Sequence, residues 1–177
     1  MNVGVLPPAM MADALADGSI DGFCAGPPWG RLSQERGAGK VAFRAVRLRS
    51  GVPEKALALR ETDPLREPET VAKLVRAVDA ASRWVGDEAN ADELFALMAE
   101  PGMVGVEAET IRAAVDRSGM RLTGRAVLRP DPSHGAWIVG RMRQGGQLGG
   151  ADGQTAEARA AGAFRSDLFD AAAGASG

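Results

Sequence analysis

The stretch GSIDGFCAGPPWG, residues 18–30, decides the fold that this sequence predicts. It contains a short apolar run, Ile20 to Ala25, with glycine before it and Gly-Pro-Pro-Trp after it. Short apolar runs between turn residues are typical of buried β-strands. Because a helical pattern follows Trp29 and ends at Gly37 or Gly39, the stretch predicts a strand that leads into a short helix.

The residues before this stretch show the same alternation. Residues 2–6 resemble another short strand, and the helical pattern after Pro7-Pro8 ends at Gly18. Two strands joined by a helix are expected to lie parallel, with a right-handed crossover. Two further strands are expected at residues 41–45 and 56–59, on either side of a turn. The sequence therefore predicts an α/β fold whose first two strands bury these side chains: Val3, Val5, Ile20, Phe23 and Cys24.

The pattern becomes helical at Pro68, which suits the first turn of a helix that runs to about Val85. Val71, Leu74 and Val78 recur on one face of this helix at helical spacing. We expect that face to pack against protein, because an apolar stripe of this length is rarely left in water. Further helices are expected at residues 92–100, 107–118, 133–142 and 155–169, with Ser133 as the N-cap of the third.

Composition argues against several classes of function. The 21 basic and 23 acidic side chains are interspersed, so no polybasic patch is present for nucleic acid or anionic lipid. No apolar run approaches the ~20 residues that cross a bilayer. The single cysteine and the single histidine, Cys24 and His134, exclude an intrachain disulfide and the usual Cys/His zinc sites, and neither has a partner for catalysis. We therefore expect no metal, no cofactor and no enzyme activity.

A series of short segments is distinctive along nearly the whole chain: LPP at 6–8, GSIDGFCAG at 18–26, PWG at 28–30, PEKALALR at 53–60, LVRA at 74–77, RW at 83–84, HGAW at 134–137 and FRSDLF at 164–169. In this order they strongly resemble the nitrate- and bicarbonate-binding proteins of ABC transporters, the CmpA/NrtA family. A general α/β fold would not supply these motifs, so the resemblance is specific.

The resemblance implies a type II periplasmic-binding-protein fold, in which two α/β lobes close on a ligand by a hinge motion. It also implies that this chain carries part of the second lobe and the C-terminal helices, and that the N-terminal lobe is missing. We expect a partial α/β lobe at residues 1–62, a return helix with a helical C-terminal segment at 63–144, and a glycine-rich link with a terminal helix at 145–177.

The function that the resemblance implies is binding of a small oxyanion, such as nitrate, nitrite or bicarbonate, in partnership with the membrane subunits of an ABC transporter. The expected ligand-binding residues are Gly26, Pro27 and Trp29, at the edge of the cleft. The family often has a charged residue where this chain has Pro27, and Pro27-Pro28 also lacks two N–H donors. Trp29 either forms a wall of the cleft or fastens its helix to the sheet.

The sequence leaves other functions open. Pro28-Trp29-Gly30, in place of Pro-Trp-Asn, and Arg129-Pro130-Asp131-Pro132 resemble the cytoplasmic nitrate sensors of the NasS-like branch, which regulate an antiterminator partner. A transport receptor would be periplasmic and a sensor cytoplasmic, and residues 1–15 show no signal-peptide pattern. An enzyme on the same fold would need clustered cysteines or histidines. The remaining alternative is a truncated fragment that binds nothing.

Overall fold

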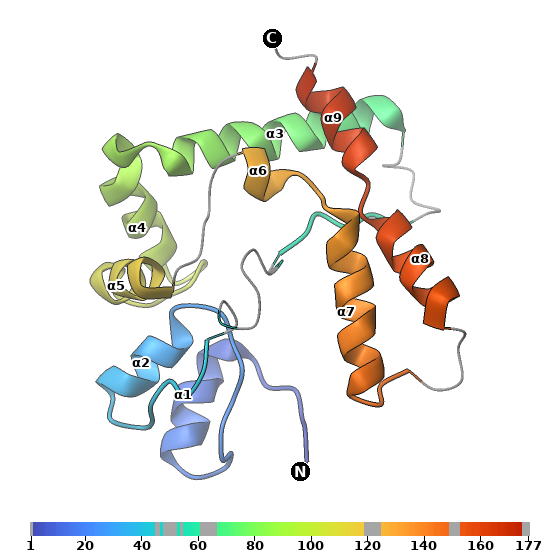
Figure 1. Cartoon of the computed structure of the whole chain (residues 1–177). Coiled ribbons are helices and arrows are strands. Elements are labelled where there is room, and N and C mark those ends of the chain that lie inside the picture. The colour runs from blue at the N-terminus through green and yellow to red at the C-terminus, as the bar shows by residue number, and fades with distance from the viewer. Residues whose placement is uncertain are drawn as a thin grey trace. The chain divides into compact units, whose positions relative to one another are not determined.

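The computed structural model describes residues 2–44, 47, 53, 55–60, 67–118, 125–148 and 153–174 (Figure 1). These residues form helices joined by coil, and none of them lies in a β-strand. The chain divides into two compact units. Unit 1 comprises Met1–Glu54 and Asp87–Arg121, and unit 2 comprises Lys55–Gly86 and Leu122–Gly177. The division into three consecutive parts stays a prediction.

The strands expected from the sequence are absent from the described residues. Residues 2–6, 20–25, 41–44 and 56–59 are coil, and residue 45 lies outside the description. Val3 and Val5 are 83% and 103% exposed, Cys24 is also exposed, and Ile20 and Phe23 are only partly buried. The prediction of two buried parallel strands is therefore wrong for this structure. A strand requires a neighbouring backbone to accept and donate its ladder hydrogen bonds, and the described residues supply none to these segments.

Unit 1 contains α1 (Pro8–Ala16), α2 (Trp29–Glu35), the 3₁₀ helix η3 (Glu88–Asn90), α4 (Ala91–Ala99) and α5 (Ala108–Ser118). The expected helix end at Gly18 is confirmed, since this glycine has a φ of 79° just beyond α1. Asp87 caps η3 by accepting a hydrogen bond of 3.0 Å from the Ala89 N–H. The helices α1 and α2 pack together, and α5 packs against both α2 and α4.

The buried side chains of unit 1 come from each of its α-helices and their entry turns: Ala12, Pro28, Ser33, Phe95, Ile111 and Ala114. Ile111 is fully buried in α5, and the Arg112 guanidinium lies 4.4 Å from the ring centre of Phe95 in α4. The Thr110 hydroxyl donates a 2.7 Å hydrogen bond to Glu35 at the end of α2. The Arg112–Phe95 contact joins α5 to α4, and the Thr110–Glu35 hydrogen bond joins α5 to α2, the helix that follows the Gly-Pro-Pro-Trp motif.

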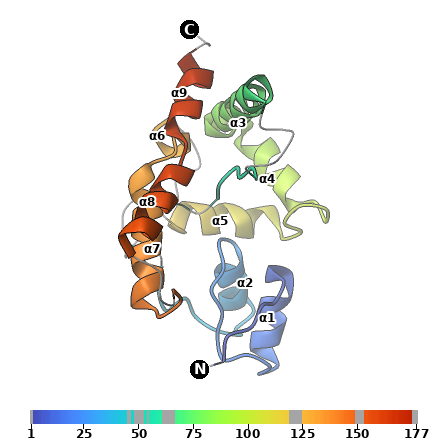
Figure 2. The same ribbon diagram turned by 90° about the vertical axis from the view of Figure 1, so that its right-hand side faces the viewer.

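Unit 2 contains α3 (Pro68–Gly86), α6 (Arg125–Leu128), α7 (Pro132–Gln144), α8 (Gly153–Ala163) and α9 (Ser166–Gly174). Both views show α7 and α8 side by side, and α9 packs against α3 (Figures 1 and 2). The N-cap of α7 is Asp131, which accepts a 2.8 Å hydrogen bond from the Ser133 N–H, so the expected Ser133 cap is wrong by two residues. The helix expected at 155–169 is two helices that meet near Arg165.

The apolar face of α3 is only partly covered. Val71 is 8% exposed and Ser82 is 7% exposed, whereas Val78 between them is 44% exposed. Leu74 is partly buried, so the expectation that the Val71, Leu74 and Val78 face packs against protein holds at Val71, holds in part at Leu74 and fails at Val78. The helix itself is confirmed from Pro68 to one residue past Val85.

Replacing Ser82 by alanine is expected to stabilise unit 2 by about 1 kcal/mol. The Ser82 hydroxyl is buried and has no hydrogen-bond partner in the described part of the chain, and such a group costs about 1–3 kcal/mol. Alanine also favours a helix by about 0.5 kcal/mol. Denaturant melts measure the change, and Ala81→Ser at the exposed neighbouring position measures the helix propensity alone. A destabilised Ser82→Ala protein would show that the hydroxyl makes a hydrogen bond after all.

Candidate functional site

The Gly-Pro-Pro-Trp motif forms the entry to α2. The peptide bond between Pro27 and Pro28 is cis, and the Pro28 side chain is fully buried. The Pro28 carbonyl accepts the first hydrogen bond of α2, 3.0 Å from the Leu32 nitrogen. The Ser33 hydroxyl, itself buried, donates a 3.1 Å hydrogen bond to the Trp29 carbonyl. The motif therefore starts the helix and anchors it to the rest of unit 1.

The three residues expected to bind ligand lie within the four-residue motif at this entry. Gly26, Pro27 and Trp29 are each partly buried, so all three keep some accessible surface. The prolines supply neither charge nor backbone N–H, and α2 has only seven residues. An anion could not rely on this helix end alone, because its first turn offers few free donors. The ligand-binding role of these residues stays a prediction.

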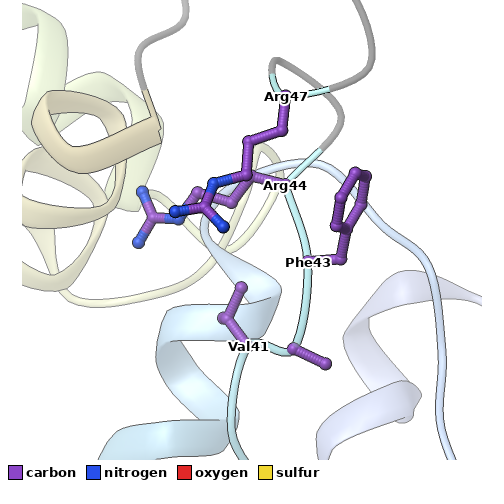
Figure 3. Close-up of a pocket in the computed structure, with 5 residues that line it drawn as sticks. Val41, Phe43, Arg44 and Arg47 are labelled. Carbon is purple, nitrogen blue, oxygen red and sulfur yellow. The ribbon is translucent and has the colours of Figure 1, made fainter.

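A shallow pocket lies beside the same entry. It has a volume of about 170 Å³ and is lined by Val41, Ala42, Phe43, Arg44 and Arg47 (Figure 3). Val41 connects it with the motif, because a Cβ atom added to Gly30 would stand 3.0 Å from the Val41 Cγ2. Gly30 directly follows Trp29, so the pocket adjoins the start of α2.

The arginines of this region differ in their ion pairs. Arg31 pairs with Glu35 at 2.6 Å, and Arg36 pairs with Asp13 at 2.6 Å. Arg44 and Arg47 form no ion pair with any of the described residues, although both line the pocket. The Arg47 N–H donates a 3.0 Å hydrogen bond to the Arg44 carbonyl.

Sequence reasoning missed these two arginines. The alternation of residues 41–45 predicts a strand and points to no role for Arg44. A signal was present, because the segment FRAVRLR at 43–49 places three arginines within six residues next to the motif. Such a cluster in an otherwise charge-balanced chain is a candidate anion site.

Neither of the potential catalytic residues, His134 and Cys24, lines this pocket. His134 belongs to α7, where its Nε2 stands 4.0 Å from the Asp131 carboxylate and its ring meets Phe164 edge-on at 6.3 Å. Cys24 is exposed in unit 1. Among the residues with described positions, no cluster of three or more histidine, cysteine, aspartate or glutamate side chains could hold a metal ion.

None of the helices within the described ranges has both the length and the hydropathy needed to cross a bilayer.

Comparison with curated proteins identifies relatives in two kinds of transport component. The chain is 29% identical to the "Bicarbonate transport ATP-binding protein CmpC" of Synechococcus elongatus, over 81% of this chain and 22% of CmpC. It is 34% identical to the "Nitrate import ATP-binding protein NrtC" of a Synechocystis strain, over 63% of this chain and 17% of NrtC. It is 31% identical to the "Nitrate/nitrite binding protein NrtA" of Synechococcus elongatus, over 72% of this chain and 29% of NrtA.

These matches cover less than a third of each relative, so the chain corresponds to only a part of them. No solved structure matches the chain significantly. Residues 1–99, which include the Gly-Pro-Pro-Trp motif and the adjoining pocket, match the NMT1-like family. This match spans more than half of the 177 residues and agrees with the resemblance seen in the motifs. The chain therefore belongs to the NMT1-like family and is related to the binding proteins of nitrate and bicarbonate transport systems.

Proposed function

We propose that this chain is part of a solute-binding protein for a small oxyanion, such as nitrate, nitrite or bicarbonate, that serves an ABC-type uptake system. The observation that carries the proposal is the family match over residues 1–99, together with relatives whose names specify nitrate, nitrite or bicarbonate transport. Closure of two lobes on the ligand would couple binding to the transporter, and no bond is made or broken. The chain is accordingly proposed not to be an enzyme.

The candidate ligand surface is Gly26, Pro27 and Trp29. An indole ring offers a flat apolar wall and one N–H donor to a planar, weakly hydrated anion. Trp29 keeps part of its surface accessible while its carbonyl is held by Ser33, so the ring is positioned by a fixed helix entry. The relatives are more than three times as long as the matched segment, so the opposing wall is proposed to come from the remainder of such a protein.

Replacing Trp29 by alanine is expected to weaken oxyanion binding about tenfold or more, which corresponds to about 1.4 kcal/mol. The measurement uses an extended chain, in which the upstream lobe is joined to these 177 residues; the lobe of NrtA from Synechococcus elongatus can serve for this purpose. Nitrate, nitrite and bicarbonate are each titrated into this protein by calorimetry. Trp29→Phe is the matched control, since it keeps a flat apolar wall and removes only the N–H donor. If Trp29→Ala leaves the affinity unchanged while the fold is intact, the indole only anchors α2.

A second candidate function is a cytoplasmic nitrate or nitrite sensor that regulates an antiterminator partner. One observation that favours it is the Pro-Trp-Gly ending of the motif, Pro28, Trp29 and Gly30. A second is that some relatives are named as ATP-binding proteins, so a segment similar to this chain also occurs in proteins that are not named as solute-binding proteins. The DNA upstream of Met1 discriminates between the two. An in-frame extension with a signal peptide indicates a periplasmic receptor, and an extension without one indicates the sensor.

A further inference from the structure

We propose that Arg44 and Arg47 form a subsite for a small planar oxyanion beside the entry of α2. The inference rests on the proposed function for the class of ligand, and it adds residues that neither the motif nor the relatives' names identify. It starts from the pocket of about 170 Å³ that these two arginines line with Val41, Ala42 and Phe43.

The two arginine side chains share one side of the segment. Figure 3 shows the Arg44 and Arg47 guanidinium groups turned to the side on which Val41 lies, with the Phe43 ring on the other side. Two like charges brought to one hollow repel each other, and both remain without a carboxylate partner in the part of the chain that the structure describes. An anion between them would remove this repulsion.

The two arginines of α2 and its C-terminal end are already paired with carboxylates. Arg31 is held by Glu35 and Arg36 is held by Asp13, each at 2.6 Å. The motif supplies no charge of its own, because its central residues are Pro27 and Pro28. An anion near the Trp29 end of α2 could therefore reach Arg44 and Arg47, unpaired among the described residues, on the Val41 side, since Val41 lies next to Gly30.

The chemistry of guanidinium selects the ligand. A guanidinium is planar and presents parallel N–H donors that match two oxygens of one anion. Nitrate and bicarbonate have coplanar oxygens and can be held by two such groups at once, whereas chloride is a single acceptor atom and cannot match two parallel N–H donors with two oxygens. The hollow has several times the ~30 Å³ that one water occupies. Because both arginines are exposed, water and salt screen the attraction, and we expect weak binding in this chain alone.

The test is NMR of the labelled 177-residue chain, following the side-chain N–H signals of Arg44 and Arg47. Sodium nitrate, sodium bicarbonate and sodium chloride are titrated separately at matched ionic strength. Nitrate and bicarbonate are expected to shift both signals along saturating curves, and chloride is expected to give a small linear shift. Arg44→Gln should weaken the anion affinity measured at the Arg47 signal about tenfold, and Arg47→Gln should do the same at the Arg44 signal. The reason is that one charged hydrogen-bond pair contributes roughly that factor.

Arg31→Gln is the control, because this arginine is already paired and should leave the saturation unchanged. The subsite would be overturned if chloride shifted the arginine signals as much as nitrate does. It would also be overturned if replacing one arginine left the anion-induced shift of the other unchanged. The proposed function fails separately: an extended chain that binds no oxyanion would refute it even if the short chain shows saturation. Conversely, the extended chain could bind an oxyanion tightly while the shifts of the Arg44 and Arg47 signals show no saturation. That result would overturn the subsite and leave the proposed function standing.

Discussion

Replacing Gly135 by alanine is expected to break the packing of α7 on α8 and to destabilise unit 2 by about 3 kcal/mol. A Cβ atom at Gly135 would overlap the Ala160 carbonyl oxygen, and it would stand 2.6 Å from the carbonyl carbon and 2.9 Å from the Ala161 nitrogen. These atoms belong to the backbone of α8, so no side-chain rotation can relieve the overlap. The two helices would have to move apart and lose their shared contact.

Gly140→Ala is the matched control in the same helix, because nothing lies within 4 Å of a Cβ atom added there. This change is expected to stabilise α7 by roughly 1 kcal/mol, since alanine is the better helix former. Fluorine NMR of a fluorotryptophan-labelled chain shows which unit loses stability when Gly135 is replaced. Trp84 and Trp137 report on unit 2, and Trp29 reports on unit 1. A Gly135→Ala protein as stable as the control would mean that α7 and α8 do not pack at this glycine.

Truncating Ile111 to alanine is expected to destabilise unit 1 by about 2–5 kcal/mol. Ile111 is fully buried in α5, which packs on both α2 and α4, so the lost methyl groups leave a cavity between these helices. Ile111→Val should cost less, about 0.5–1.5 kcal/mol, because only one methylene is removed. Denaturant melts followed at the Trp29 signal measure the graded loss.

Met103 provides the comparison for this series, since it is 68% exposed in the same unit. Met103→Ala is expected to change stability by less than about 0.5 kcal/mol. If the Ile111 and Met103 substitutions have equal effects, α5 does not form part of a packed core in unit 1.

The helices were predictable from the sequence, because their signals are local. The spacing of Val71 and Leu74 and the proline at Pro68 predict α3, which the structure confirms from Pro68 to Gly86. The helices expected at 92–100 and 107–118 are confirmed within one residue as α4 and α5. Caps and breaks were less predictable. The end of α8 falls where Arg165 pairs with Asp167 through hydrogen bonds of 2.8 and 2.6 Å, a contact that helical periodicity cannot reveal.

The strands and the site were less predictable, because they depend on groups distant in the sequence. Val3 and Val5 have strong β-propensity, but a strand forms only against another backbone, and the described residues offer none to them. The predicted site residue Trp29 was placed correctly at the start of a helix. The position of the pocket beside it was not predictable, because the proximity of Val41 to Gly30 is apparent only in the folded chain.

The most direct test of the central claim, that this chain holds part of an oxyanion site which a larger protein completes, is one calorimetric comparison. Nitrate is titrated into the 177-residue chain and into the extended chain that restores the upstream lobe. We predict no measurable heat of binding for the short chain and saturable binding for the extended one. Tight binding by the short chain, or no binding of nitrate, nitrite or bicarbonate by the extended chain, would contradict this account.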